Sequence, residues 1–218
     1  MIRPVSWGPP PVERADAARN RRHLLSIARE MLAEQGADKV TMDALAERAG
    51  LGKGTVFRRF GTRAGIFQAL LDDAERDFQQ RILCGAPPLG PGAPAQDRLI
   101  AYGRERTDFL IRHREIARAA LDGREPVPMG AQSPMSYEHI HSLLTQMPLP
   151  DLELDVLTMQ LTAALDGPLL LYLSFDLLTD DPRRLAERLS RGWEDLIRRA
   201  LRPQKAAATV KKQIQPDS

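Results

Sequence analysis

The stretch that most constrains the fold is 40–60, VTMDALAERAGLGKGTVFRRF. Thr41 is a residue type whose hydroxyl accepts a hydrogen bond from an unpaired N–H at a helix start. Gly50 can adopt the left-handed conformation that a sharp turn after a helix requires. Apolar residues recur at helical spacing on both sides of that glycine. They are Leu45, Ala46 and Ala49 before it, and Leu51 and Val56 after it. The pattern predicts two short helices joined by a tight glycine turn.

The second of these helices has a polar face of one charge sign. Lys53, Thr55, Arg58 and Arg59 fall on it, and no acidic residue lies between Gly50 and Phe60. The alternative is a helical hairpin buried in an ordinary α-helical core, but a solvated helix face normally mixes its charges. A cationic face that includes threonine suits phosphates and base edges. We therefore interpret the stretch as a DNA-binding helix-turn-helix, whose second helix enters the major groove.

The distribution of charge supports this interpretation. The whole chain of 218 residues has a formal net charge of only +2. Residues 11–63 hold 11 Lys and Arg against 7 Asp and Glu, a net charge of +4, whereas residues 64–218 hold 19 against 22, a net charge of −3. The basic part of the chain coincides with the predicted helix-turn-helix, as a DNA-contacting domain requires.

Residues 24–71 resemble the N-terminal domain of the TetR family of transcriptional regulators. Two positions depart from the commonest family pattern: Gly52 stands where a serine often caps the second helix, and Phe57 stands where tyrosine is usual. The residues that carry the resemblance, in order, are Gly36, Leu45–Ala46, Ala49–Gly50, Lys53–Gly54–Thr55, Phe57, Phe60 and Arg63.

DNA contacts are expected from the helix-turn-helix and from cations that flank it. The family has a basic residue at the start of its fourth helix that touches the DNA backbone, and Arg63 occupies that position; an exposed arginine without a function is the alternative. Arginines just ahead of the first apolar helix are further candidates for phosphate contacts. The full expected set is Thr41, Lys53, Gly54, Thr55, Phe57, Arg58, Arg59, Arg63, Arg21 and Arg22.

The rest of the chain reads as helices, so the expected fold class is all-α with about nine helices. A Pro/Gly-rich stretch at 85–94, GAPPLGPGAP, separates two parts. We expect a disordered arm at 1–12, a helix-turn-helix domain at 13–62, a connecting helix at 63–84, a helical ligand-binding and dimerisation domain at 85–202, and a disordered tail at 203–218.

One helix-turn-helix contacts too few base pairs for useful specificity, which favours a two-fold dimer on a palindromic operator. The resemblance implies that the last two helices, here about 152–178 and 183–201, form a four-helix bundle with the partner's copies. Packing within their own domain is the alternative for these apolar faces. Trp193 is a residue type that anchors interfaces. The expected interface residues are Leu185, Leu189, Trp193 and Leu196.

The resemblance also implies a pocket in the second domain for a small-molecule effector of unknown identity. Asp166 stands out because it lies in an apolar run, TAALDGPLLLYL, where a carboxylate needs a partner, water or a cavity. It could also be a bend residue beside Gly167 and Pro168, and Pro168 should kink the helix. For the others, membership of the core is the alternative. The candidate lining residues are Tyr102, Phe109, His113, Met135, Tyr137, Met159, Asp166, Tyr172 and Phe175.

Several other classes are disfavoured. Cys84 is the one cysteine, and His139 and His141 point to different faces of a helix, so we expect no metal site and no cofactor. The sequence shows no 18-residue apolar run and no signal peptide, which favours a cytoplasmic protein with no membrane partner. An enzyme with an attached helix-turn-helix would need a catalytic motif that we do not find. A non-specific structural DNA-binding protein would usually have a larger basic excess. The resemblance implies a repressor.

Overall fold

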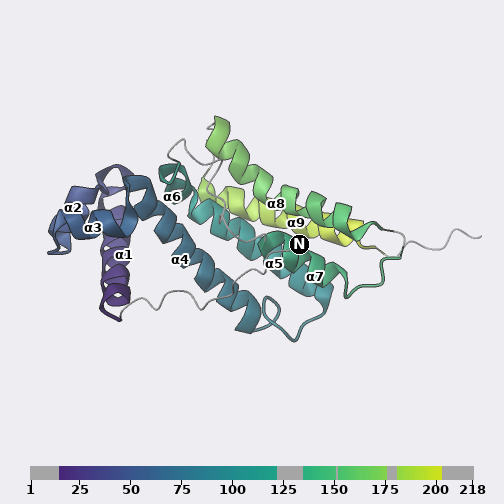
Figure 1. Ribbon diagram of the computed structural model, residues 1–218. Helices are drawn as coiled ribbons and strands as arrows, with labels where there is room; N and C mark the ends of the chain where they lie inside the picture. Colours follow the sequence, from purple (N-terminus) through teal and green to yellow (C-terminus); the bar gives the residue numbers. More distant parts are fainter. Residues whose placement is uncertain (1–14, 122–134, 151, 176–180, 203–218) are drawn as a thin grey trace, which may run out of the picture.

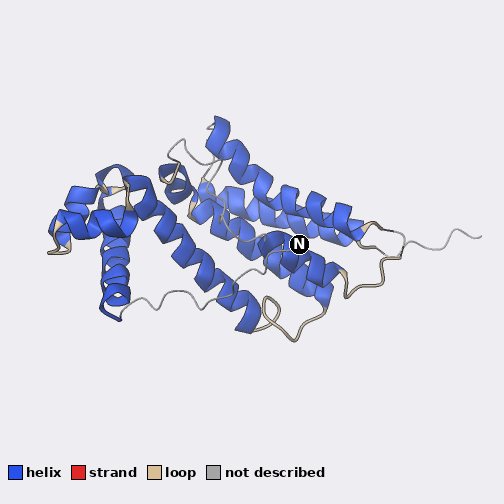
Figure 2. Cartoon of the chain, viewed as in Figure 1, coloured by secondary structure: helices blue, strands red, loops and turns tan. Residues whose placement is uncertain are grey.

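The computed structural model describes residues 15–121, 135–150, 152–175 and 181–202. Within those ranges the chain forms nine α-helices and one short 3-10 helix, with no strand (Figure 2). The expectation of an all-α fold is therefore confirmed. The expected arm at 1–12 and tail at 203–218 lie outside the described residues.

The first helices form a compact unit at one end of the molecule (Figure 1). Leu45 of α2 and Val56 of α3 are fully buried between the helices. Gly50 has φ of +64°, the left-handed turn that the sequence predicts. The elements are α1 (Ala15–Gln35), the 3-10 helix η1 (Ala37–Lys39), α2 (Met42–Arg48) and α3 (Lys53–Phe60).

Helix α4 (Arg63–Cys84) leaves this unit and runs along the second part of the chain (Figure 1). Its start is fixed locally, because the Thr62 hydroxyl accepts a hydrogen bond from the backbone N–H of Gly65 at 3.0 Å. Its N-terminal half buries Ile66, Phe67 and Leu70 in the core of the first unit. Its C-terminal half buries Phe78 and Ile82 in a second core. The helix thus belongs to both cores.

The second part of the chain is a bundle of helices that lie side by side (Figure 1). Helix α5 packs against α7, α8 and α9, and α7 packs against α8. Of the two helices expected at about 152–178 and 183–201, the first begins two residues later and the second begins and ends one residue earlier; position 178 lies outside the described residues. The helices of this part are α5 (Ala95–Arg112), α6 (Arg114–Ala119), α7 (Met135–Leu144), α8 (Leu154–Phe175), which continues through Pro168, and α9 (Pro182–Ala200).

A contact between α5 and α9 corrects one expected role. Trp193 of α9 is only 4% exposed, and its indole Nε1 donates a hydrogen bond to the backbone oxygen of Leu99 at 3.0 Å. The expectation that Trp193 anchors a dimer interface is therefore wrong for this side chain. Its ring lies in the core of its own chain. There the neighbouring helix α5 provides apolar side chains for the ring and the Leu99 carbonyl for its N–H.

Helix α8 keeps much of its apolar surface outside this core. Its inner face contributes Leu161, Leu165 and Leu169 to the bundle. By length and composition the segment Leu154–Leu171 could cross a membrane, although a core helix of a soluble protein passes the same test; here 28% of the segment is buried. Residues of the described ranges therefore leave much of this apolar helix uncovered, and we call the uncovered side the unpartnered face of α8.

Short helix α6 joins the two parts of the molecule. Ala117 and Ala120 are buried in the core of the first unit, together with residues of α1 and α4. Helix α6 also packs against η1 and against α8. A displacement within the bundle can therefore reach the helix-turn-helix by two routes, through α4 and through α6.

Candidate nucleic-acid interface and the bundle behind it

The outward face of α3 is cationic and open. Lys53, Gly54, Phe57 and Arg58 are exposed, and Thr55 and Arg59 are half-buried. Positions 53, 54, 57 and 58 share one face because they follow the 3.6-residue period. A Cβ atom added at Gly52 or Gly54 would meet nothing within 4 Å, so the backbone there is open to close approach. Helix α3 therefore presents two cations and an aromatic ring on an unobstructed surface.

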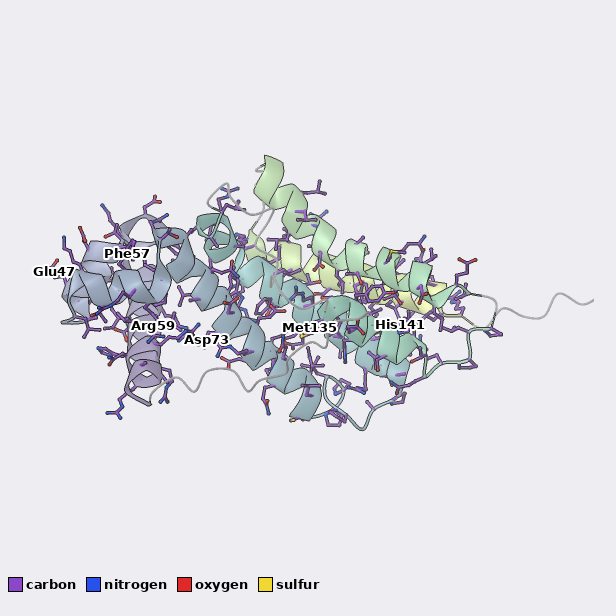
Figure 3. The ribbon with its side chains drawn as sticks, in the orientation of Figure 1. Glu47, Phe57, Arg59, Asp73, Met135 and His141 are labelled. Carbon is purple, nitrogen blue, oxygen red and sulfur yellow. The ribbon has the colours of Figure 1, made fainter. Side chains whose placement is uncertain are left out.

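Phe57 is the largest apolar group on this face, with 63% of its surface exposed. Figure 3 labels Phe57 on the helix-turn-helix unit, at the end of the molecule opposite the bundle. A phenyl ring cannot make the hydroxyl contact of a tyrosine, but apolar side chains read the methyl group of thymine in the major groove. The exposed ring therefore suits a base contact.

Lys53 is held by a neighbouring acid. Its Nζ lies 2.9 Å from Oδ2 of Asp43, and both side chains are largely exposed. Asp43 lies in the first turn of α2, beside the Thr41 cap, where the Thr41 hydroxyl accepts a hydrogen bond from the N–H of Ala44 at 3.1 Å. The structure thus places one negative charge at the edge of the cationic surface, paired with the lysine.

Three of the arginines expected to contact phosphate are engaged within the chain. Arg63 donates from Nε to the backbone oxygen of Val40 at 2.9 Å and from Nη2 to that of Ala37 at 2.7 Å. Arg59 donates to the backbone oxygen of Ala17 at 3.1 Å. Arg21 lies 4.0 Å from Asp73 of α4. Arg22 is exposed. Backbone carbonyls near η1 and the start of α1 give the Arg63 and Arg59 guanidinium groups local partners.

Arg63 therefore has a structural role within the chain. Its guanidinium also lies over the Phe67 ring, 4.9 Å from the centroid. These contacts join the start of α4 to the linker before α2, so they set the angle between the connecting helix and the helix-turn-helix. The sequence analysis did not predict this role, because every residue has a backbone carbonyl and the residue pattern therefore does not show which carbonyl will be a partner.

The expected effector residues occupy different environments. Tyr102 and Phe109 are buried in the core, Met135, Tyr137 and His113 are half-buried, and burial lowers the pKa of His113. Met159 is 56% exposed on the outside of α8, so the expectation that it lines an internal pocket is wrong. The side chains of Tyr172 and Phe175 lie outside the described residues.

Asp166 is buried and faces a charge that the sequence analysis did not identify. Its Oδ1 lies 3.7 Å from Nε of Arg106, and burial raises the pKa of the carboxyl. Arg106 in turn binds both carboxylate oxygens of Glu75 on α4 through Nη1, at 2.8 and 3.0 Å. A buried ion pair therefore ties the connecting helix to α5, with Asp166 of α8 beside it.

Arg106 is one of three polar residues on one face of α5. Arg98, Tyr102 and Arg106 are four residues apart, on the same stripe as buried Leu99 and Phe109. The sequence could have shown this role of Arg106, because a cation that lies on the apolar stripe of a helix is a candidate for a buried charge. We call these three residues and their partners the α5 seam; the partners are Glu75, Ser136, His139 and Asp166.

Polar atoms along the α5 seam are incompletely satisfied. Tyr102 donates to the Ser136 hydroxyl at 2.7 Å, and burial raises the pKa of Tyr102 to about 12. In the described part of the chain, four buried side-chain N or O atoms lack a hydrogen-bond partner, and all four belong to the seam. They are Arg98 Nε, Arg106 Nε, His139 Nε2 and Asp166 Oδ1. Each such atom costs about 1–3 kcal/mol of folding free energy.

Taken together, the fold and the cationic α3 surface define a helix-turn-helix protein with a helical second domain. Residues 24–70 match the family model described as bacterial regulatory proteins, tetR family. Over these residues the chain has the N-terminal domain of the TetR family of bacterial regulatory proteins.

Individual relatives agree with that placement. An HTH-type transcriptional repressor of Mycobacterium tuberculosis is 32% identical over 109 residues, covering 50% of this chain and 55% of its own length. The chain spans about half the length of the curated relatives it matches.

Solved structures match over nearly their whole length, at identities that show the fold alone. A TetR/AcrR-family regulator from Thermobifida fusca has a TM-score of 0.55 at 19% identity, covering 81% of this chain and 97% of that chain. A TetR-like regulator from Rhodococcus sp. RHA1 has a TM-score of 0.52 at 17% identity, covering 84% and 96%.

Proposed function

We propose that this protein is a sequence-specific transcriptional regulator that represses by binding a palindromic operator as a dimer. The observation that carries the proposal is the outward face of α3, where Lys53, Gly54, Phe57 and Arg58 are exposed together. Arg58 can donate two hydrogen bonds to guanine, and Phe57 can contact a thymine methyl. Lysine and helix N–H groups supply phosphate contacts. Such a surface can contact base edges as well as phosphates.

A dimer is supported by the unpartnered face of α8. Val156, Met159 and Leu171 are large apolar residues that remain 40–56% exposed. Leu152, Val156, Met159 and Ala163 recur at spacings of four, three and four, the repeat of a helix–helix seam, and Leu171 lies eight residues further along. A second copy related by a two-fold axis would cover this face and place two α3 helices on one side of the duplex.

Helix α9 would contribute to the same surface. Leu196 is 40% exposed, and a groove between α8 and α9 is lined by apolar groups including Pro168, Leu189 and Leu196. Leu185 is half-buried nearby on the same helix. Of the residues expected at the interface, the three leucines therefore remain available, whereas Trp193 lies beneath them.

The regulator would respond to a small-molecule effector in the bundle. The contacts that support this are the Arg106–Glu75 pair and the packing of α6 into the first core, since both join the bundle to the helix-turn-helix. A ligand shifts the equilibrium only when it binds the two conformations unequally. We propose that occupancy changes the angle of α4, and with it the separation of the two α3 helices. As a DNA-bound regulator the protein would act in the cytoplasm and not as an enzyme.

Selection from random duplex DNA at near-physiological salt tests the proposal. The expected result is a palindrome whose half-sites are separated by about 34 Å or a multiple of it. Recovery of no consensus, together with binding that disappears as salt rises, would favour a non-specific structural DNA-binding protein instead. Recovery of a single, non-palindromic site would support sequence-specific binding and would contradict binding as a two-fold dimer.

A further inference from the structure

The Arg98 end of the α5 seam differs from the Arg106 end in its charge. At the Arg106 end, the guanidinium is neutralised by Glu75, and the two unpartnered atoms, Arg106 Nε and Asp166 Oδ1, face one another at 3.7 Å. A small shift would let them satisfy each other. At the Arg98 end, no carboxylate within the described ranges pairs with the guanidinium.

His139 stands beside Arg98 and carries no charge at neutral pH. Burial first, and then the positive charge of Arg98, lower the pKa of His139 to about 4. Its ring packs against that of Tyr102 with centroids 4.7 Å apart, which fixes its orientation from α7 toward α5. In the tautomer with hydrogen on Nε2, this atom and Arg98 Nε are both unused donors; a carboxylate accepts from both kinds of group.

We propose that the Arg98–His139 pair binds the acidic group of an organic monoanion, whose apolar body enters between α5 and α7 beside half-buried Met135. An anion at this place supplies the charge that Arg98 lacks and acceptors for two buried donors. Tyr102 is fully buried there, and half-buried Met135 packs against the same core. A neutral ligand of the same shape would leave the Arg98 charge uncompensated, so the site discriminates by charge.

This assignment rests on the proposed effector response and names the chemistry of its ligand. The Tyr102 hydroxyl already donates its hydrogen bond to Ser136, so it is not free to donate to the ligand. Specificity for the acid therefore depends on Arg98 and His139, while buried Tyr102 holds the His139 ring in place.

The probes are benzoate, phenylacetate and octanoate, each compared with its neutral amide, titrated into the full chain by isothermal calorimetry. At least one carboxylate is expected to bind one per chain, at least tenfold more tightly than its amide. Arg98→Gln is expected to weaken carboxylate binding at least tenfold and to leave the amide unchanged. Arg112→Gln, which alters an exposed arginine of the same helix paired with Asp108, is the control and should bind as the wild type does.

Equal affinity for acid and amide would overturn the proposal, as would an Arg98→Gln variant that binds normally or a failure of all three acids to bind. Thermal unfolding of Arg98→Gln without ligand shows whether the variant is folded. Arg98→Lys, which keeps the charge, should retain more carboxylate affinity than Arg98→Gln, and the reverse order would also count against the site.

A separate titration of operator DNA distinguishes this inference from the proposed function. If a carboxylate binds through Arg98 but leaves operator affinity unchanged, the anion site stands and the effector response fails. If the operator is bound and no acid binds, the DNA-binding function stands and the anion site fails.

Discussion

Gly103 of α5 lies directly against the indole of Trp193 on α9: a Cβ atom at position 103 would be 2.0 Å from Trp193 Nε1. The absence of a side chain lets the two helices approach closely enough for Trp193 to reach the Leu99 carbonyl. The indole is enclosed by the core, so it has little room to withdraw.

Gly103→Ala is therefore expected to lower the free energy of unfolding by about 1–3 kcal/mol, the usual cost of overpacking a core. Chemical denaturation measures it. Gly54→Ala is the matched control, because a Cβ there meets nothing within 4 Å. Gly54 lies in the first turn of α3, so replacing this glycine should stabilise that variant by at most about 0.5–1 kcal/mol. A Gly103→Ala variant as stable as the wild type would show that α5 and α9 can separate at little cost.

Arg58→Ala is expected to reduce discrimination between the preferred operator and a scrambled duplex by about 1–3 kcal/mol, because a bidentate contact to guanine is lost. Dissociation constants on the two duplexes at one salt concentration give the ratio of affinities.

Arg63→Ala should behave differently, because it removes the donors to the Ala37 and Val40 carbonyls. The free energy of unfolding should fall by about 1–3 kcal/mol, while the ratio of affinities for the two duplexes stays the same. Equal losses on both duplexes for Arg58→Ala would limit that residue to the DNA backbone.

Asp43→Asn should tighten binding to every duplex. The change releases Lys53 from its partner 2.9 Å away and removes a negative charge from the edge of the DNA-binding surface. One additional phosphate contact steepens the dependence of log K on log salt by about 0.9. Salt titrations with two unrelated duplexes measure it. Asp195→Asn, an equal charge change at an exposed position of α9, should leave the slope as it is. An unaltered slope for Asp43→Asn would mean that Lys53 does not reach a phosphate.

Met159→Asp is expected to weaken dimerisation by about 2 kcal/mol or more, because it buries a carboxylate in the interface proposed for α8. Sedimentation over a dilution series reads the monomer–dimer equilibrium. Leu83→Asp makes the same kind of change on α4, at a side chain that is 66% exposed, and should leave the equilibrium alone. If the Met159 variant stays dimeric at the lowest concentration, α8 does not form the interface.

His139 should make stability fall as the solution is acidified. Its pKa is about 4 in the folded chain against an ordinary value of 6.5, so below pH 6.5 the unfolded chain takes up the proton first. The contribution is fully present above pH 6.5 and is lost between pH 6.5 and about 4. The slope is at most about 1.4 kcal/mol per pH unit, and partial exposure of the ring reduces it. His139→Gln should flatten the difference in unfolding free energy between pH 7 and pH 5; parallel curves would contradict this.

Local features of the fold could be predicted from the sequence because each depends on residues near in the chain. The Thr41 and Thr62 caps bond to N–H groups three residues on, and Gly50 has the positive φ that its turn requires. The bounds of α4 follow from such signals at both ends. The order and spacing of the helix-turn-helix residues were likewise enough to indicate the family.

The tertiary structure decided which face of each helix meets which neighbour. Helical spacing shows that Trp193, Leu189 and Leu196 are close on α9, yet only packing against α5 turns the tryptophan inward and leaves Leu196 outside. The same holds for Met159, which the bundle leaves on the surface. Arg106 is buried because Glu75 and Asp166, from helices distant in the chain, converge on it. Periodicity records which residues share a face, whereas burial and pairing depend on contacts between helices that no local pattern encodes.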